Sequence, residues 1–210
     1  MEKLIELEII KADLIEIDRQ FQINKFKDMS SIILLKQLFV TISNLVDFEL
    51  TIRFLYVDNP NMSNLYSKVS RENEFIKYIR NKFVAHINKE LLNTAAIWKP
   101  EIRCMFQYIH KPEIAFLYNL WILETTINTY VKPDGTHKIF NSETDLFLKK
   151  DLNRFLKFLI YAMKHSIHYL DEFGKIIGKN IQKLSFSELD LKYWEDAGKI
   201  DFKYIKKTKR

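Results

Sequence analysis

Residues that interrupt helices are scarce in this chain, which has four glycines and four prolines among its 210 residues. Glycine weakens the interior of a helix and proline ends or kinks it, so their scarcity predicts long helices with short connections. The apolar residues also recur at helical spacing, and the alternation typical of strands is rare. We therefore expect an all-α fold, a bundle of long helices whose size suits a single hydrophobic core.

Capping residues and helix breakers set the expected ends of the helices. Ser30 and Ser31 are candidate N-caps for a very apolar second helix. Asp58-Asn59-Pro60-Asn61 ends that helix, because proline removes a backbone donor and restricts the residue before it. Helices are expected over about residues 2–23, 30–56, 95–109, 112–131 and 142–177. One further helical span breaks near Ser70 and ends near residue 87, and residues 88–94 are a weakly determined connection.

The C-terminal third contains one strong turn and one loss of periodicity. Lys132-Pro133-Asp134-Gly135 is the clearest turn signal in the chain. Ser142 and Asp145 have the spacing of a capping box, which predicts that the last long helix starts there. The apolar periodicity weakens after Lys179. We therefore expect a helical domain over residues 1–178 and a C-terminal appendage with a basic tail over residues 179–210.

The formal net charge of +6 is concentrated at the C-terminus. Residues 198–210 contain six bases and one acid, a charge of +5, so residues 1–197 carry only +1. The body of the protein is therefore not a polycation, and any attraction to nucleic acid has to come from local patches or from the tail. The tail is either a solvated terminus or a binding arm.

Composition also predicts the compartment. The single cysteine, Cys104, excludes an internal disulfide and is typical of a reducing environment. The first residues carry acids where a signal peptide carries bases. Lys36, Asn44 and Asn119 interrupt the most apolar stretches, so we expect no membrane span of about 18 residues. These features predict a soluble cytoplasmic protein.

Residues 80–86, which read RNKFVAH, place an arginine, an amide and a histidine within two turns of the expected third helix. Arginine offers a planar fork of donors to phosphate oxygens, and histidine moves protons near neutral pH. These residue types are suited to phosphodiester chemistry. Arg103 and His110 form a second such pair, but the residues after Arg103 are ordinary helix-filling types, so Arg80, Asn81 and His86 are the candidate site.

A helical wheel places these side chains relative to an apolar stripe. At about 100° per residue with Ile79 at the centre, His86 falls about 20° from the centre of the stripe and Arg80 falls at its edge, near 100°. Asn81 points away from the stripe. His86 is thus expected either as a satisfied core residue or as a base in a partly desolvated cleft.

The string RNKFVAH resembles the R-x(4–6)-H signature of the HEPN superfamily, and Ala85 before His86 is similar to its abortive-infection branch. HEPN proteins are small helical domains that include many metal-independent endoribonucleases. The resemblance, which covers mainly residues 30–90, implies a HEPN-like homodimer with two copies of the motif in one cleft. It implies that His86 acts as base or acid when an RNA 2′-hydroxyl attacks phosphorus. Arg80 would stabilise the phosphate charge, Asn81 would orient the phosphate or the Arg80 side chain, and no metal or cofactor would take part.

The same resemblance implies a toxin or phage-defence effector with RNA as substrate and an antitoxin or other regulatory protein as partner. HEPN toxins paired with a nucleotidyltransferase antitoxin often have tyrosine two residues after the histidine, where this chain has Asn88. That form of regulation is therefore not expected. The alternative is a non-catalytic HEPN-type dimer that binds RNA or a protein.

Two other groups of residues were considered as sites. His165, His168, Asp171 and Glu172 have a spacing that suits a divalent metal, but such residues on a lysine-rich helix are typical of a solvated face. Glu124 lies in an apolar segment and is expected as a buried acid, with no second carboxylate nearby in sequence. We therefore expect neither a metal site nor catalysis at Glu124.

Overall fold

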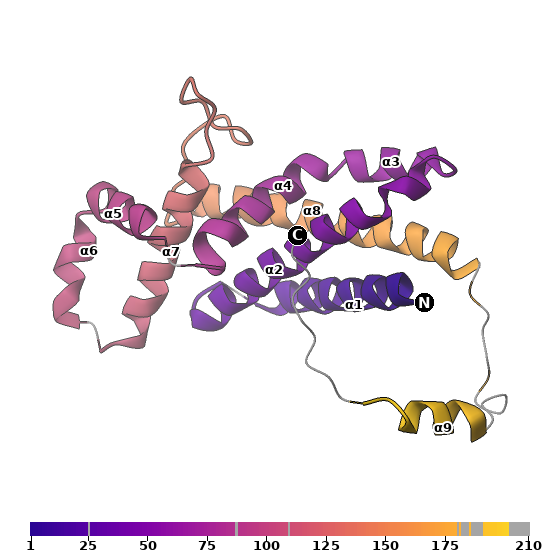
Figure 1. Cartoon of the computed structure of the whole chain (residues 1–210). Helices are drawn as coiled ribbons and strands as arrows, with labels where there is room; N and C mark the ends of the chain where they lie inside the picture. The colour runs from indigo at the N-terminus through magenta and orange to yellow at the C-terminus, as the bar shows by residue number, and fades with distance from the viewer. Residues whose placement is uncertain are drawn as a thin grey trace. The chain divides into compact units, whose positions relative to one another are not determined.

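The structure, a computed structural model, describes residues 1–24, 26–86, 88–108, 110–179, 181, 185 and 191–201. Within these residues the fold is all-α, as the sequence predicts, and the only pairing of extended chain is an isolated bridge between Val131 and His137. The chain separates into two compact units, Met1–Gly178 and Lys179–Arg210. Figure 1 shows the helices of both units.

The helices of the first unit vary widely in length, and short 3₁₀ and π turns extend several of them. They are α1 (Glu2–Ile23), α2 (Met29–Ile52) with a 3₁₀ turn η1 (Arg53–Tyr56), α3 (Pro60–Ser67), α4 (Ser70–Ile79) with a π turn η2 (Arg80–Val84), α5 (Lys89–Trp98), α6 (Glu101–Cys104) with a 3₁₀ turn η3 (Met105–Tyr108), α7 (Pro112–Asn128) and α8 (Lys149–Lys179). The described part of the second unit contains α9 (Leu191–Gly198), with Leu191, Tyr193 and Trp194 exposed.

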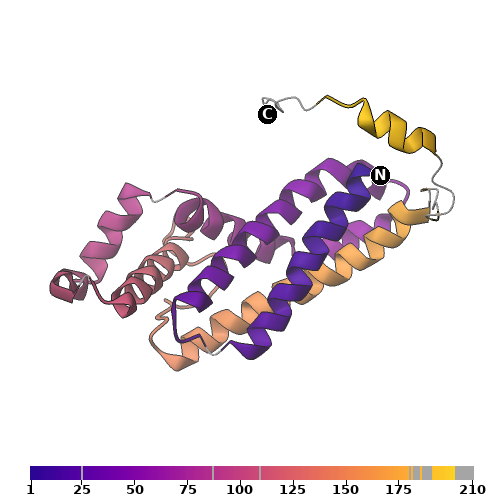
Figure 2. The same cartoon turned by 90° about the horizontal axis from the view of Figure 1, so that it is seen from below.

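The main core lies between α1, α2, α4 and α8, which run side by side in Figures 1 and 2. Helix α1 buries one face at the spacing expected of an amphipathic helix, whereas α2 is buried on most of its circumference. Contacts between distant segments close the bundle: Tyr56 and Tyr169 hydroxyls lie 2.7 Å apart, and the Asn73 amide donates to the Ser166 hydroxyl at 3.2 Å. The buried face of α1 consists of Leu7, Ile10, Leu14, Ile17 and Phe21.

Helices α5, α6 and α7 form a smaller layer at the end of the bundle where α4 terminates, on the left in Figure 1. A second apolar cluster of Ala95, Ile102 and Trp121 holds these helices together. Helix α7 also packs against α2 and against the π turn, so this layer is continuous with the main bundle. The segment of chain that contains the candidate site therefore lies where the two layers meet.

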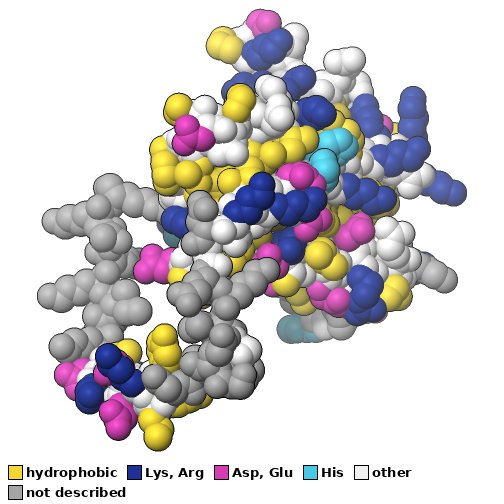
Figure 3. All heavy atoms as spheres, turned by 90° about the vertical axis from the view of Figure 1, so that its right-hand side faces the viewer, with side chains coloured by type: hydrophobic (Ala, Val, Ile, Leu, Met, Phe, Trp, Pro, Cys, Tyr) yellow, Lys and Arg dark blue, Asp and Glu magenta, His cyan; other side chains and the backbone are white. Residues whose placement is uncertain are grey.

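Figure 3 shows the end of the first unit that faces right in Figure 1, where hydrophobic side chains gather beside lysine and arginine. The large hydrophobic residues exposed on α1 and η1 include Ile5 and Phe54. The combined helix Met29–Tyr56 is long and apolar enough, by length and composition alone, to span a membrane. Lys36, which was expected to interrupt this apolar stretch, does not make it too polar to do so. Of the most apolar stretch of this helix, 56% is buried within the protein, where it forms part of the main core.

The first expected helix, residues 2–23, is confirmed at both ends, but three other helix starts were predicted wrongly. The cap of α2 is Asp28 instead of Ser30 or Ser31, because the Asp28 carboxylate accepts from the Ser31 amide at 3.2 Å and from the Ser30 hydroxyl at 2.6 Å. The expected connection at 88–94 is mostly helix α5. Asn88 caps it by accepting from the Glu90 and Leu91 amides.

The last long helix begins at Lys149, so the predicted start at Ser142 is wrong. The polar groups of the preceding segment bond to other elements instead of capping a helix. The Arg154 guanidinium donates to the Ser142 hydroxyl at 2.7 Å, and the Asn128 amide exchanges two hydrogen bonds with the Thr144 backbone, at 2.8 and 2.9 Å. These bonds hold residues 142–148 as an ordered loop over α7.

Phe75 provides a test of the core. It is fully buried on α4, and its ring contacts Tyr130, Phe140 and Phe158 from three other segments. We expect Phe75→Ala to lower the free energy of unfolding by about 3–5 kcal/mol, because the cavity it leaves cannot close fully. Urea unfolding followed by circular dichroism measures this loss. Phe54→Ala, which removes a ring that is 70% exposed, is the matched control and should change stability by less than about 0.5 kcal/mol.

Candidate functional site

A π turn ends the helix that carries the candidate motif. Helix α4 ends at Ile79, and Arg80–Val84 form one wide turn in which the Ala85 amide donates to the Arg80 carbonyl at 2.9 Å. That bond spans five residues instead of the four of an α-helix, so the turn holds one extra residue. Wide turns of this kind occur at the C-terminal ends of helices. The motif therefore begins where the helical geometry changes.

The helix ends with this turn, so His86 does not continue it. Ala85 and His86 lie in the bend that follows Val84. The expectation that His86 lies near the centre of the apolar stripe is therefore wrong: Phe83 is buried within the turn, but the His86 side chain is exposed to solvent. Ile87, the next residue, which was expected in the stripe, lies outside the described residues.

Arg80 lies half-buried at the first position of the π turn. Its Nη1 donates to the Asn81 side-chain oxygen at 3.1 Å, whereas its Nε is buried and has no acceptor. No carboxylate of the described chain forms an ion pair with this guanidinium. Arg80 is thus a partly desolvated cation with an unused donor, held by an exposed neighbouring amide.

Arg80, Asn81 and His86 are brought to the same end of α4 but are not joined into one network. The Arg80–Asn81 bond is present, whereas no hydrogen bond links Arg80 to His86 in the part of the chain that is described. Arg103 and His110 of the second sequence match are both exposed. A single copy of the chain therefore offers a cation and an imidazole as separate groups.

A separate cavity lies between α5, α7 and the loop that precedes α8, and has a volume of about 890 Å³. At its wall the Lys99 ammonium lies 2.5 Å from the Glu124 carboxylate, and Glu124 also accepts from the Leu146 amide at 2.9 Å. Burial raises the pKa of Glu124, and the Lys99 charge opposes that rise. The expectation of a buried acid is confirmed, and its partner is a lysine instead of a second carboxylate.

His137 was missed in the sequence and is the most constrained histidine near this cavity. Its Nε2 lies 2.8 Å from the Ile127 carbonyl, and its Nδ1 accepts from the Ile139 and Phe140 amides at 3.0 and 2.8 Å. One tautomer satisfies all three contacts: neutral, with the proton on Nε2. Both ring nitrogens are therefore used in holding the loop. The nearby turn at residues 132–135 was the one sequence signal that this segment is ordered.

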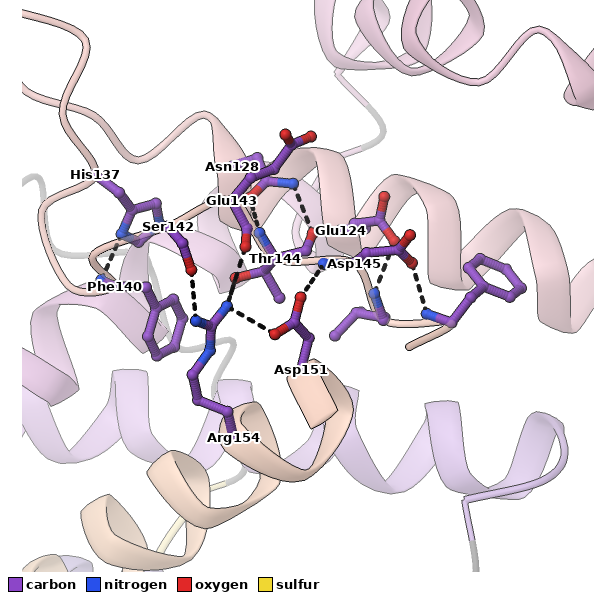
Figure 4. A network of polar contacts seen from close by, with 12 residues as sticks. Glu124, Asn128, His137, Phe140, Ser142, Glu143, Thr144, Asp145, Asp151 and Arg154 are labelled. Atoms are coloured by element: carbon purple, nitrogen blue, oxygen red, sulfur yellow. Dashed lines mark hydrogen bonds and ion pairs between the residues drawn. The ribbon is translucent and has the colours of Figure 1, made fainter. Parts of the chain in front are cut away.

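Figure 4 shows that polar groups around this cavity mostly bond to one another. Arg154 from α8 donates to the Ser142 and Thr144 hydroxyls and pairs with Asp151 at 3.3 Å. The Arg154 Nε, like that of Arg80, is buried without an acceptor among the described residues, but both other nitrogens of its guanidinium are bonded within the network. The network stabilises the loop over α7 and is a weaker functional candidate than Arg80 and His86.

The possible metal cluster on α8 does not come together. Asp171 pairs with Lys11 at 3.5 Å, Glu172 pairs with Lys175 at 2.5 Å, and the His165 ring contacts Tyr161. Among the described residues, no three histidine, cysteine or acidic side chains lie close enough to hold a metal ion.

Comparisons with protein-family models, with curated proteins and with solved structures found no match for this chain. Function must therefore be inferred from the chemistry of its residues. The half-buried Arg80 with its unused donor, beside an exposed Asn81 and His86, is the feature that favours a reaction with an anionic substrate.

The buried imidazole of His137 gives a prediction about pH. Burial lowers the pKa of His137 below its ordinary value of 6.5, so below about pH 6.5 the unfolded chain binds a proton that the folded protein resists. We expect wild-type stability to fall as the pH drops from 7.5 to 5.5, and His137→Gln to reduce that fall. Urea unfolding at both pH values measures the effect, and the difference between the two proteins isolates the histidine. Equal pH dependence in both proteins would contradict the fixed neutral tautomer.

Proposed function

We propose that this protein is a metal-independent endoribonuclease of the HEPN type, acting as a toxin or phage-defence effector. The observation that carries the proposal is the Arg80 guanidinium, half-buried, without a carboxylate partner among the described residues, and with Nε lacking an acceptor. A cation in such a place is suited to phosphate oxygens, which would supply the acceptors that the protein lacks. His86, exposed six residues later, supplies a group that accepts and donates protons.

A second copy of the chain would complete the site. Arg80 and His86 are about 9 Å apart along a regular helix axis, and they do not share a hydrogen bond within one copy. Two copies related by a two-fold axis would bring a pair of arginines and a pair of histidines to one phosphate. The exposure of His86 supports this arrangement, because an imidazole sealed in the core of one copy could not reach a shared substrate.

The proposed reaction moves two protons, one from the attacking 2′-hydroxyl and one to the leaving 5′-oxygen. One His86 takes the proton of a ribose 2′-hydroxyl, whose oxygen forms a bond to the adjacent phosphorus. The bond from phosphorus to the 5′-oxygen of the next nucleotide breaks, and that oxygen receives a proton from His86 of the second copy. The products are a 2′,3′-cyclic phosphate and a 5′-hydroxyl. Arg80 stabilises the charge on the phosphate, and Asn81 holds the guanidinium in place.

Regulation and location follow from the same proposal. An RNase that damages the RNA of its own cell needs an antitoxin or another regulatory protein, and its substrate is found in the cytoplasm. The basic tail would add non-specific affinity for RNA. Most of its bases (residues 203–210) lie outside the described residues, and Lys199 pairs with Asp196 at 3.4 Å.

One observation favours a second candidate, a non-catalytic HEPN-type dimer that binds RNA or a protein. A catalytic histidine is usually oriented by a third group, whereas the exposed His86 has no such hydrogen bond in the described part of the chain. Binding would need only the Arg80 cation and the surrounding surface. A cleavage assay separates the two candidates.

We expect His86→Ala and Arg80→Ala each to reduce RNA cleavage by about 10²–10⁴-fold, because each removes a group that acts on the reacting phosphate. Cleavage should persist in EDTA and leave a cyclic phosphate, measured by gel electrophoresis and mass spectrometry of the products. Arg103→Ala, an exposed arginine of the second sequence match, is the control and should retain activity. Equal loss in the Arg103 variant, or a requirement for added metal, would reject the mechanism. Melting temperatures recorded alongside separate lost catalysis from lost folding.

The composite site also predicts a homodimer in solution. Light scattering at micromolar concentration should give about twice the chain mass, and a charge placed in the contact, as in Asn81→Glu, should shift the protein toward monomer. The exposed Asn81 lies on the motif turn, so this change tests the interface at the site itself. A monomer that nevertheless cleaves RNA would disprove the shared cleft.

A further inference from the structure

Lys36 is a second cation without a carboxylate partner, and it lies beside the π turn. It is half-buried on α2, and its ammonium group lies 4.9 Å from the centre of the Phe83 ring. Burial lowers the pKa of Lys36, and within the described ranges no acidic side chain lies within ion-pair distance of it. A desolvated ammonium costs folding free energy unless an anion compensates it. Within the described chain no group of the protein supplies that anion.

A cavity of about 180 Å³ opens at this lysine, between α2, the π turn, α5 and α7. Its walls are mainly apolar, and its two charged groups are both lysines, Lys36 and Lys82. Glu90 lines a neighbouring cavity, which Lys82 also lines, and does not line this one. The remaining lining residues are Phe83, Asn88, Leu91, Leu92, Tyr118, Asn119 and Ile122.

Tyr118 provides an independent sign of a missing ligand. Its hydroxyl is buried and has no hydrogen-bond partner, although the residue lines the cavity. The ring is held in place by contacts with Trp121 and Phe106. A buried hydroxyl without a partner lowers the stability of the folded protein. The cavity therefore combines uncompensated positive charge and an apolar surface with a tyrosine whose hydroxyl is unsatisfied.

The size and chemistry of the cavity restrict its ligand. A volume of about 180 Å³ equals roughly six waters, which is below the range for a drug-sized molecule and suits a single ring system. An apolar wall, a hydroxyl and two ammonium groups fit a flat ring with hydrogen-bonding edges attached to an anion. We infer that the cavity binds one nucleotide of single-stranded RNA, with the base against the apolar wall and Tyr118, and a phosphate at Lys36 and Lys82.

This inference rests on the proposed RNA substrate and adds a binding subsite to it. Lys82 and Phe83 belong to the same π turn as Arg80, so a strand that places its scissile phosphate at Arg80 passes close to the cavity. The nucleotide in the cavity would fix the register of the strand relative to the reacting groups. Base stacking and phosphate contacts of this kind are general features of single-strand binding.

The test uses a fluorescein-labelled RNA octamer with 2′-O-methyl groups at every position, which cannot be cleaved by 2′-hydroxyl attack. Fluorescence anisotropy with the full chain measures its Kd over a range of salt concentrations. We expect Lys36→Met to raise the Kd about tenfold, and to lower the slope of log affinity against log salt by about 0.7. Lys157→Met, which removes an exposed lysine of α8, is the charge-matched control and should leave the Kd within about twofold.

Tyr118→Phe separates a binding role from a structural one. Removing the unpartnered hydroxyl should raise the melting temperature of the free protein, because a buried unsatisfied group is lost, and should weaken RNA binding several-fold. A purely structural tyrosine cannot produce opposite effects on stability and affinity. A nucleoside 5′-monophosphate added as competitor shows whether the cavity takes a free nucleotide as well as the strand.

The outcomes separate this inference from the proposed activity. If the octamer binds the wild type no better than the Lys36→Met and Tyr118→Phe variants, the subsite is wrong, even where unmodified RNA is cleaved at Arg80 and His86. If both variants weaken binding as expected but no RNA is cleaved, the subsite stands and the nuclease proposal fails. Lys157→Met weakening the octamer as much as Lys36→Met would assign the effect to overall charge and overturn the subsite.

Discussion

The burial of α2 is the constraint on which the rest of the first unit depends. This helix has apolar side chains on most of its circumference, so it needs neighbours on nearly every side. Helices α1 and α4 flank it, and α7 and the π turn pack against it at the end where the smaller layer begins. A helix that is surrounded in this way fixes the direction of each element around it. Because α2 also carries Lys36, it sets the position of the cationic cavity relative to Arg80.

The sequence was sufficient to predict the helical class and the first helix, because α1 has a regular stripe and the breaker at residues 58–61 is unambiguous. It failed where a local signal had a competing partner. Ser142 looked like an N-cap, but its hydroxyl instead accepts a hydrogen bond from the Arg154 guanidinium, twelve residues later in the chain. Ser30 and Ser31 looked like caps, but Asp28 lies two residues earlier and a carboxylate accepts more strongly. Such competitions depend on tertiary contacts that periodicity does not contain.

The candidate site was predictable in its residue types and not in its geometry. Arg80 is half-buried and Asn81 is exposed, as the helical wheel gives, since they are the first two residues of the irregular turn. His86 lies after the π turn, and no residue in the string marks where a helix takes up an extra residue. The cavity at Lys36 was also beyond the reach of sequence, because Lys36, Lys82 and Tyr118 are brought together from three separate elements. In the sequence, Lys36 only marked an interruption of an apolar stretch. In the structure, its ammonium group lies over the Phe83 ring.

The order of the helices along the chain has a consequence for synthesis. Helix α2 is apolar enough to resemble a membrane segment, and a nascent chain that exposed it alone would be prone to aggregation or to capture by membrane-insertion machinery. Helix α1 precedes it in the chain and packs directly along it. A ribosome therefore releases the amphipathic cover before the segment that needs covering, and the two form a local hairpin with little loss of loop entropy. The outer face of α1 carries ion pairs such as Lys3–Glu6 and Arg19–Glu16 among its exposed isoleucines, so charge accompanies the first helix pair while α4 and α8 are still being made.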